Sequence, residues 1–245
     1  MSVDENNFLE ILNDSGYDRI IVKPSIDSAS GVGVRLFYKN DNKWISHNGT
    51  EVLNKFFIDK EYGKDVIIQE CAEQSEYISQ FNSTSINTLR LTLYRSVKDD
   101  NCYVTSSIIR IGSKGNVVDN AHAGGCYVGI QSDGILDNKV LDQWGNIRYE
   151  FNNIDFKKIY QIPNWPKIID FAKGIGSCIP HHRLLALDLM IDKEGNPKVI
   201  EFNCQYYSMW LFQFTTIGAL GDFTDEIIEY CKEQIDNVEF ALYLK

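Results

Sequence analysis

The stretch that decides the fold is LLALDLMIDKEGNPKVIEFN, residues 184–203. Two apolar runs, Leu184–Ile191 and Lys198–Phe202, are separated by the turn-forming sequence DKEGNP. Apolar runs of this length on either side of a glycine-containing turn predict two antiparallel strands joined as a β-hairpin. We expect the turn to be centred between Glu194 and Gly195, and that centre determines which residues face each other across the two strands.

Three oxygen-bearing side chains meet in this hairpin. With that turn centre, Asp188 faces Glu201, and Asn203 shares a strand face with Glu201 because side chains two residues apart point the same way. Two facing carboxylates repel each other, and burial increases that cost. A largely buried setting is predicted by apolar neighbours, which are Leu187, Leu189, Val199, Ile200 and Phe202.

A bound cation would remove this repulsion. Hard oxygen ligands with room for water or phosphate oxygens suit Mg²⁺ better than Zn²⁺, so the candidate metal ligands are Asp188, Glu201 and Asn203. The alternative is a pair of solvated carboxylates on an outer sheet face beside a surface turn. The spacing alone is compatible with both interpretations.

A second feature lies near the N-terminus, where the apolar stretch Arg19–Lys23 predicts a buried strand that Pro24 ends. A loop rich in serine and glycine follows it. Glycine lets the backbone approach a ligand closely and serine adds hydroxyl donors, so this loop could cradle phosphate beside the Lys23 amino group. The candidate loop residues are Ser28, Ser30, Gly31 and Gly33. The alternative is an ordinary hairpin loop with an exposed lysine.

A third feature is a pair of arginines on expected strands. The segment Asn87–Val97 alternates between leucines on one face and other residues, including Arg90, on the opposite face. Arg110 lies near the end of the next expected strand, ahead of a glycine-rich connection that contains Asp119 and Asn120. Arginine on such a strand could bind phosphate or carboxylate through a bidentate pair of N–H donors. The alternative for each arginine is a surface salt bridge.

The remaining segments predict a mixture of helices and strands. Helices are expected at Asp4–Asn13, Glu51–Ile58, Trp165–Cys178, Met209–Leu220 and Thr224–Ile235. Further strands are expected at Arg35–Tyr38, Asp65–Gln69, Tyr103–Ile111 and Tyr127–Gln131. The second of them is expected to be buried, and the third carries Arg110. Because strands dominate the middle of the chain and helices surround them, we expect an α+β fold with mainly antiparallel sheets.

Composition excludes several classes of protein. The 245 residues carry a net charge of −10 without a basic run, which argues against nucleic-acid binding. No apolar stretch approaches the roughly 18 residues of a membrane span, and the acidic start MSVDENNFLE has no signal-peptide core. We therefore expect a cytoplasmic protein whose six cysteines, which form no CxxC motif, are reduced and buried.

Taken in order, these features resemble the ATP-grasp family. The resemblance rests on a strand ending in Lys23-Pro24, a loop of small residues, a strand ending in Gln69-Glu70, and a late Asp…Glu-x-Asn pattern. The segments Asn87–Arg90, 118–120 and Gly124-Gly125 are similar to the branch of that family associated with sugar transfer. The resemblance covers roughly residues 8 to 235. The family's usual N-terminal domain has no counterpart here, so we expect either a natural short form or a fragment that needs another domain or a partner enzyme.

The resemblance implies two α+β sub-domains, residues 1–70 and 71–245, that sandwich ATP bound with Mg²⁺. It implies that Arg90 and Arg110 are catalytic and hold the transferred phosphoryl group or an acyl-phosphate. Asp188, Glu201 and Asn203 would hold the metal. The implied nucleotide-binding residues are Lys23, Ser28, Ser30, Gly31 and Gly33 at the phosphates, Gln69, Glu70, Cys71 and Ala72 at the adenine, Glu76 at the ribose, and Asn120.

The resemblance also implies a function. Its members make an acyl-phosphate from a small-molecule carboxylate and couple the acyl group to an amine, so we expect an amine or a sugar as the acceptor here. The branch suggests that the reaction modifies a cell-surface polysaccharide or glycan precursor. Two alternatives remain open at this point. One is a non-catalytic nucleotide-binding module, or a truncated fragment, that acts with a glycan-biosynthesis partner. The other is a kinase on the same fold.

Overall fold

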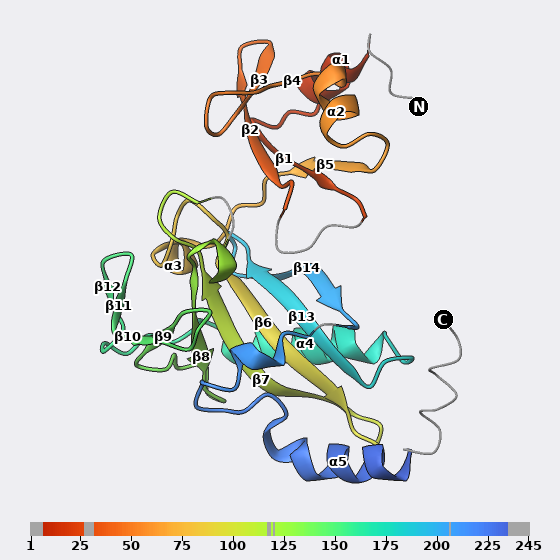
Figure 1. The fold of residues 1–245 in the computed structure, drawn as a ribbon, viewed down its shortest axis with the longest axis vertical. Coiled ribbons are helices and arrows are strands. Elements are labelled where there is room, and N and C mark those ends of the chain that lie inside the picture. Colours follow the sequence, from red (N-terminus) through yellow and green to blue (C-terminus); the bar gives the residue numbers. More distant parts are fainter. Residues whose placement is uncertain (1–6, 27–31, 117–118, 120, 206, 235–245) are drawn as a thin grey trace. The chain divides into compact units, whose positions relative to one another are not determined.

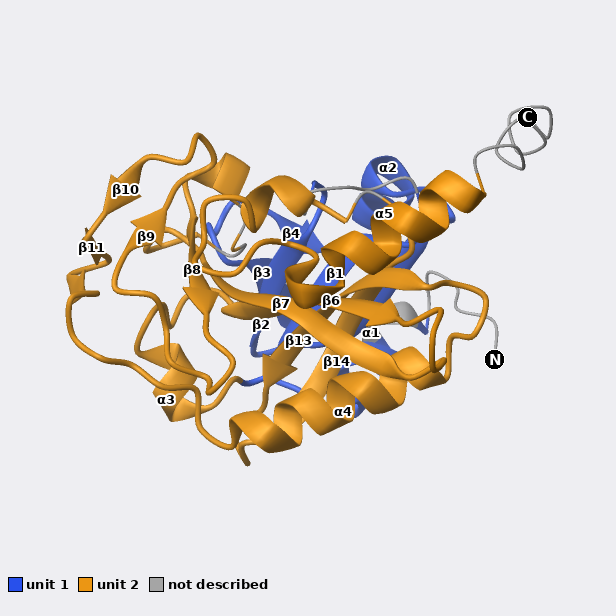
Figure 2. Ribbon diagram, turned by 90° about the horizontal axis from the view of Figure 1, so that it is seen from below, with its two compact units in different colours: residues 1–73 blue, residues 74–245 orange. Residues whose placement is uncertain are grey.

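The computed structural model describes residues 7–26, 32–116, 119, 121–205 and 207–234. The chain divides into two compact units, Met1–Glu73 and Gln74–Lys245, which Figure 2 shows in different colours. Both units combine helices with antiparallel sheets, which confirms the expected α+β class (Figure 1).

Unit 1 contains a five-stranded sheet in the order β4-β3-β2-β1-β5, in which every neighbouring pair is antiparallel. Its elements are α1 (Phe8–Asp14), β1 (Arg19–Pro24), β2 (Arg35–Asn40), β3 (Lys43–Ser46), β4 (Val52–Leu53), α2 (Lys55–Glu61) and β5 (Val66–Glu70). Its core gathers buried apolar side chains from the sheet and both helices, among them Ile20, Val22, Phe37, Trp44 and Ile58.

Two expectations for unit 1 need correction. The segment 65–69 is a strand, but β5 is at the edge of the sheet and is only partly buried, since it pairs with β1 alone. The helix expected at 51–58 begins later, because Val52–Leu53 pairs with β3 as β4. Asn54 then caps α2 by accepting a hydrogen bond from the Phe57 N–H at 2.8 Å.

Unit 2 contains a seven-stranded sheet in the order β10-β9-β8-β7-β6-β13-β14 and a separate β11-β12 ribbon. Its strands are β6 (Thr88–Arg95), β7 (Cys102–Ile111), β8 (Cys126–Ile130), β9 (Val140–Leu141), β10 (Ile147–Arg148), β11 (Glu150–Phe151), β12 (Ile154–Asp155), β13 (Leu184–Ile191) and β14 (Pro197–Asn203). Its helices are α3 (Glu76–Ser79), η1 (Ala121–Ala123), α4 (Trp165–Ser177), η2 (Met209–Leu211), η3 (Gly221–Phe223) and α5 (Thr224–Glu233).

The two faces of this large sheet have different coverings. Leu89, Leu91 and Leu93 of β6 point into the main core, as their alternation predicted. Leu185, Leu187 and Leu189 of β13 join them there, together with residues of α4. Arg90 and Tyr94 lie on the opposite face, where Tyr94 packs against Phe223 of η3 with ring centroids 5.5 Å apart. Figure 2 shows α4 and α5 on opposite sides of the sheet. The face that carries Arg90 is therefore covered by the C-terminal part of the chain.

The helix expected over 209–220 is wrong. Only the short η2 forms there, and the chain then continues in turns. Threonine hydroxyls compete with helical hydrogen bonds in this segment. Thr215 donates its hydroxyl to the Phe212 and Ile217 carbonyls, each at 2.8 Å, and Thr216 donates to the buried carboxylate of Asp137 at 2.6 Å.

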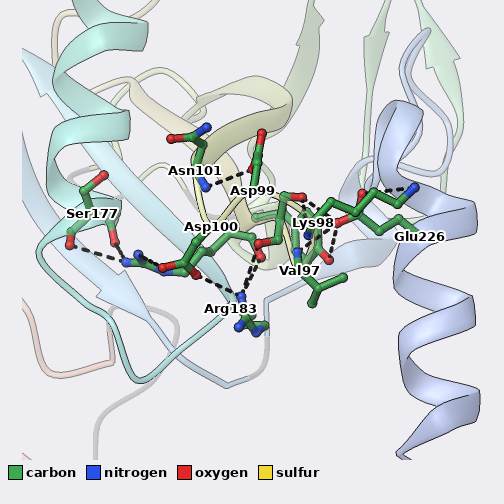
Figure 3. Close-up of polar contacts among 12 residues, drawn as sticks. Val97, Lys98, Asp99, Asp100, Asn101, Ser177, Arg183 and Glu226 are labelled. Atoms are coloured by element: carbon green, nitrogen blue, oxygen red, sulfur yellow. Dashed lines mark hydrogen bonds and ion pairs between the residues drawn. The ribbon is translucent and has the colours of Figure 1, made fainter.

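A single carboxylate holds α5 against the β6–β7 turn (Figure 3). Glu226 accepts hydrogen bonds from the Tyr94 hydroxyl at 3.0 Å, the Ser96 hydroxyl at 2.7 Å and the Val97 N–H at 2.9 Å. The Ser96 hydrogen bond is the main reason why the pKa of Glu226 lies below its ordinary value.

Two further expectations can be compared with the described residues. All six cysteines are free, but only Cys102 and Cys126 are buried, whereas Cys178 and Cys231 are exposed. The expectation of six buried thiols is therefore wrong in part. Within the described ranges no helix has the length and apolar character needed to cross a membrane.

Helix α4 offers a matched test of core packing. A Cβ at Gly176 would lie 2.4 Å from the sulfur of buried Cys102, whereas a Cβ at Gly174 would meet nothing within 4 Å. We expect Gly176→Ala to lower the free energy of unfolding by about 1–3 kcal/mol through overpacking. Gly174→Ala should raise it by about 0.5–1 kcal/mol through helix propensity.

Urea denaturation measures both effects. In Cys102→Ala/Gly176→Ala the clash with sulfur is removed, so the double variant should lose less than the sum of the two single variants. Equal stability of the Gly174→Ala and Gly176→Ala proteins would contradict this packing of α4.

Candidate functional site

The β13–β14 hairpin brings the expected carboxylates together. Asp188 pairs with Glu201, as the sequence predicted, and Ala186 pairs with Asn203. Nearer the turn, however, Leu189 pairs with Val199, so that Ile200 is an extra residue in a β-bulge. Without this bulge Asp188 would face Ile200. The bulge therefore places Glu201 opposite Asp188, a use of bulges that is frequent beside functional sites.

A row of charged residues crosses three neighbouring strands. Arg90 of β6 pairs with Asp188 of β13, which pairs in turn with Glu201 of β14. The Arg90 Nε and Nη2 atoms each donate to one Asp188 carboxylate oxygen at 2.7 Å. Asp188 has an exposed fraction of 0%. Arg90 thus forms a buried bidentate ion pair, not the surface salt bridge that was its alternative.

Arg110 of β7 joins this cluster. Its Nη2 atom lies 3.1 Å from Asp119 Oδ1 and 3.5 Å from Asp188 Oδ2. Burial opposes the charge of Arg110, but the carboxylates of Asp119 and Asp188 outweigh it and raise the pKa of the guanidinium. The Arg110 Nε atom is buried and has no partner among the described residues. An unpaired buried donor of this kind can serve an anionic ligand.

The outer end of the row is open. Glu201 lies on β14, the edge strand, and its side chain is 57% exposed. Asn203 lies beside it, with its Nδ2 atom 3.5 Å from Glu201 Oε1. The largely buried setting expected for both strands is therefore right for β13 and wrong for β14, whose residues Val199, Ile200 and Phe202 are exposed.

The charges of the cluster do not cancel. Three carboxylates, of Asp119, Asp188 and Glu201, face two guanidinium groups, of Arg90 and Arg110, which leaves one negative charge. Partial burial and the charge of Asp188 together raise the pKa of Glu201. The repulsion that suggested a metal is thus relieved mainly by arginine and remains at Glu201.

The donor set fits a hard cation. Each carboxylate oxygen has two lone pairs, so Asp188 keeps acceptor capacity beside Arg90, while Glu201 and the Asn203 amide oxygen are accessible at the edge. No group of three or more His, Cys, Asp or Glu side chains suited to a metal occurs in the described part of the chain. A cation here would accordingly be held by two carboxylates and one amide oxygen, ligands that suit Mg²⁺.

Unit 1 contains the expected phosphate-binding residues. Lys23 pairs with Ile67 in the sheet, and its amino group makes no ion pair with any residue that the structure describes. Gly33 has a φ of +79°, and a Cβ there would lie 2.9 Å from Pro24 Cγ, so this position requires glycine. Four candidate residues lie outside the described residues, namely Ser28, Ser30, Gly31 and Asn120.

The expected adenine-binding segment, Gln69 to Ala72, begins at the end of β5. Gln69 and Glu70 are the last two residues of that strand, and the Cys71 N–H donates to the Arg19 carbonyl at 3.2 Å. Burial raises the pKa of the Cys71 thiol. Ala72 lies next in unit 1, whereas Glu76 lies in unit 2, in the first turn of α3. The nucleotide-binding roles of these residues stay predictions.

Sequence reasoning missed how Asp119 acts. It grouped Asp119 with the arginines but did not identify it as the buried partner of Arg110. Asp119 also accepts a hydrogen bond from the Thr88 N–H at 3.1 Å. The only sequence signal was its position in the connection that follows the Arg110 strand. Sequence reasoning also gave no sign that Asp137 holds Thr216.

Comparison with known proteins identifies the family. A family model described as sugar-transfer associated ATP-grasp matches residues 4–225. The chain therefore belongs to the ATP-grasp proteins, and within them to the sugar-transfer associated family. A search of curated proteins found no match.

Solved structures show more distant likenesses. A D-alanine–D-alanine ligase from Coxiella burnetii is 10% identical, with 99% of this chain and 54% of that chain covered and a TM-score of 0.45. The ATP-grasp ligase PsnB in complex with the precursor peptide PsnA2 and AMPPNP is 14% identical, with 94% and 51% covered and a TM-score of 0.45. N5-carboxyaminoimidazole synthetase from Staphylococcus aureus in complex with ADP is 10% identical, with 83% and 38% covered and a TM-score of 0.40. The chain spans only about half the length of these proteins, or less.

The buried ion pair can be tested by a double-mutant cycle. Asp188→Asn leaves Arg90 charged and buried without its partner, so we expect the free energy of unfolding to fall by about 3–5 kcal/mol. Arg90→Gln should be similarly costly, and the double variant should lose less than the sum of the single variants. Denaturant unfolding provides these values. Arg19→Gln, which breaks an exposed ion pair with Glu73, is the control and should cost about 0–1 kcal/mol. Strict additivity at Arg90 and Asp188 would contradict the bidentate pair.

The raised pKa of Glu201 predicts a pH effect. The folded state holds the Glu201 proton more tightly than the unfolded chain does, so stability falls as the pH rises from the ordinary value of 4.5 through the folded-state pKa. Glu201→Gln lacks this penalty. In metal-free buffer its melting temperature should therefore exceed that of the wild type at neutral pH, with the difference vanishing below pH 4.5. Thermal melts across this range measure the effect, and a variant less stable than the wild type at neutral pH would refute it.

Proposed function

We propose that this chain is an ATP- and Mg²⁺-dependent ligase that activates a carboxylate as an acyl-phosphate and couples it to an amine. Its family membership gives the class. The observation that supports the site is the Arg90–Asp188–Glu201 row, which is buried at one end and open to solvent at the other. Arg110 lies beside this row. Such chemistry depends on neutralising and positioning charge and needs no protein nucleophile.

The proposed reaction has two steps. A carboxylate oxygen of the substrate attacks the γ-phosphorus of ATP, a new O–P bond forms, and the bond to the leaving ADP breaks. The amine then attacks the acyl carbon, a C–N bond forms, the C–O bond to phosphate breaks, and the nitrogen releases a proton. Glycan precursors are the proposed setting, because the family is associated with sugar transfer.

The residues of unit 2 have distinct proposed tasks. Asp188, Glu201 and Asn203 would hold Mg²⁺, which supplies charge neutralisation at the phosphates. Arg90 uses Nε and Nη2 to orient Asp188, so it acts mainly through that carboxylate. Arg110 has an Nε atom without a hydrogen-bond partner among the described residues, so it is the better candidate to contact the transferred phosphoryl group or the acyl-phosphate.

Unit 1 would contribute the phosphate and adenine contacts. The Lys23 amino group, which makes no ion pair with any described residue, would bind the ATP phosphates, and so would the backbone at Gly33. The segment from Gln69 to Ala72 would contact adenine through backbone groups. Glu76, which belongs to unit 2, would contact the ribose. The proposed division of labour is thus phosphate and adenine binding by unit 1 and metal binding by unit 2.

Thermal unfolding with and without Mg–ATP tests the nucleotide site. Ligand at about 100 times its Kd stabilises by about 2.7 kcal/mol, which at this size corresponds to a rise of about 5–10 °C in Tm. Glu201→Gln should abolish most of this rise without unfolding the protein, because Glu201 is half-exposed. Lys23→Gln should also reduce it. The control is Glu194→Gln, in the same hairpin but outside the cluster.

Product analysis tests the reaction class. ADP release in the presence of a carboxylate, with capture of the acyl group by hydroxylamine, would support the acyl-phosphate step. A phosphorylated hydroxyl product without capture would indicate a kinase. A Tm rise with no ADP release over a panel of carboxylates and amines would indicate a non-catalytic nucleotide-binding module. No Tm rise in the wild type would overturn the proposed nucleotide site of this chain.

A further inference from the structure

Unit 2 contains a cavity of 370 Å³ that the Arg90–Asp188–Glu201 cluster does not use. It lies between the glycine pair Gly124-Gly125 at the start of β8 and the β9–β10 hairpin. Cavities of about 300–1,000 Å³ bind small organic ligands. The cavity and the cluster share a segment of the sequence. Asp119, the partner of Arg110, is two residues before Ala121, which lines the cavity.

The β9–β10 turn holds an aromatic ring out toward solvent. The Asp142 carboxylate accepts hydrogen bonds from the Trp144 N–H at 2.9 Å and from the Asn146 N–H at 3.0 Å. The Phe214 ring packs so closely against Gly145 that a Cβ there would lie 3.0 Å from it. Trp144 lines the cavity and is 76% exposed. A ring held beside the cavity by a well-bonded turn offers an apolar face on which the ring of a ligand can stack.

The rest of the wall combines apolar residues, Ala121, Cys126 and Val140, with polar ones. Gln143 and Asn146 contribute amides, and the Gln143 side chain is oriented by a hydrogen bond of 2.5 Å with His122. Amides both donate and accept, and so do the hydroxyl groups of a sugar. The Arg148 side chain is 55% exposed, and its ion pair among the described residues is with Asp142 at 3.5 Å. Arg148 therefore retains donors for a planar anion such as a carboxylate.

We propose that this cavity binds a sugar ring bearing a carboxylate, with the ring stacked on Trp144, its hydroxyls on the amides and its carboxylate on Arg148. The formal charges of Asp142 and Arg148, the two charged residues among those that line the cavity, cancel. That this sugar is a substrate of the ligation rests on the proposed function. Binding of the sugar to the cavity is independent of that function, because every wall residue belongs to unit 2 and none to the metal cluster.

Saturation-transfer NMR with D-glucuronate tests the proposal. The wild type should bind glucuronate saturably and D-glucose more weakly. Trp144→Ala should weaken both sugars about tenfold through loss of stacking, while Arg148→Gln should weaken glucuronate alone. Phe56→Ala, which removes a 72% exposed aromatic side chain outside the cavity, is the matched control and should change nothing.

Several results would overturn the proposal. They are the absence of saturable glucuronate binding, equal binding by the Trp144→Ala and Phe56→Ala proteins, displacement of glucuronate by inorganic phosphate at equal concentration, and tighter Trp144-dependent binding of adenosine. Glu201→Gln should bind glucuronate normally. Glucuronate binding in a wild type that shows no Mg–ATP stabilisation would therefore refute the proposed function and leave the sugar site standing.

Discussion

The buried pair of Arg90 and Asp188 is the interaction on which the candidate site depends. A carboxylate with no solvent exposure is tolerated only if its charge is paired and its oxygens are hydrogen-bonded. Both conditions hold here, because Arg90 donates to both oxygens at 2.7 Å and Arg110 approaches at 3.5 Å. That geometry requires β6, β7 and β13 to keep one register, since a shift of one residue would turn each side chain to the other face.

The same pair determines which part of the cluster stays open to solvent. Its inner end is neutralised by protein groups, whereas Glu201 and Asn203 lie on an edge strand. Three carboxylates against two arginines leave one negative charge, and at the open end partial burial together with the charge of Asp188 raises the pKa of Glu201. A cation would therefore be attracted to Glu201 and Asn203 first. Asp188 contributes a charge whose position the arginines have already determined.

Local patterns predicted the sequence-adjacent part of this arrangement and not the rest. The alternation in β6 and the hairpin around DKEGNP gave the strands and the Asp188–Glu201 pairing. Arg90 and Asp188 are 98 residues apart, and no local pattern joins them. The bulge at Ile200 was not visible either, because it compensates for a turn centre that differs from the expected one. The 209–220 segment failed as a helix because Thr215 and Thr216 bond to carbonyls and to Asp137, a tertiary effect that outweighs helical periodicity.

The cavity beside Trp144 shows the same division between local and long-range information. Its turn is locally encoded, because an aspartate that accepts from the residues two and four positions later is a sequence-near arrangement. Its wall is not, since Gly124 and Gly125 reach it from another part of the chain. The two sites share one segment of the chain, because Asp119 is the counter-ion of Arg110 and Gly124 and Gly125, a few residues later, line the cavity.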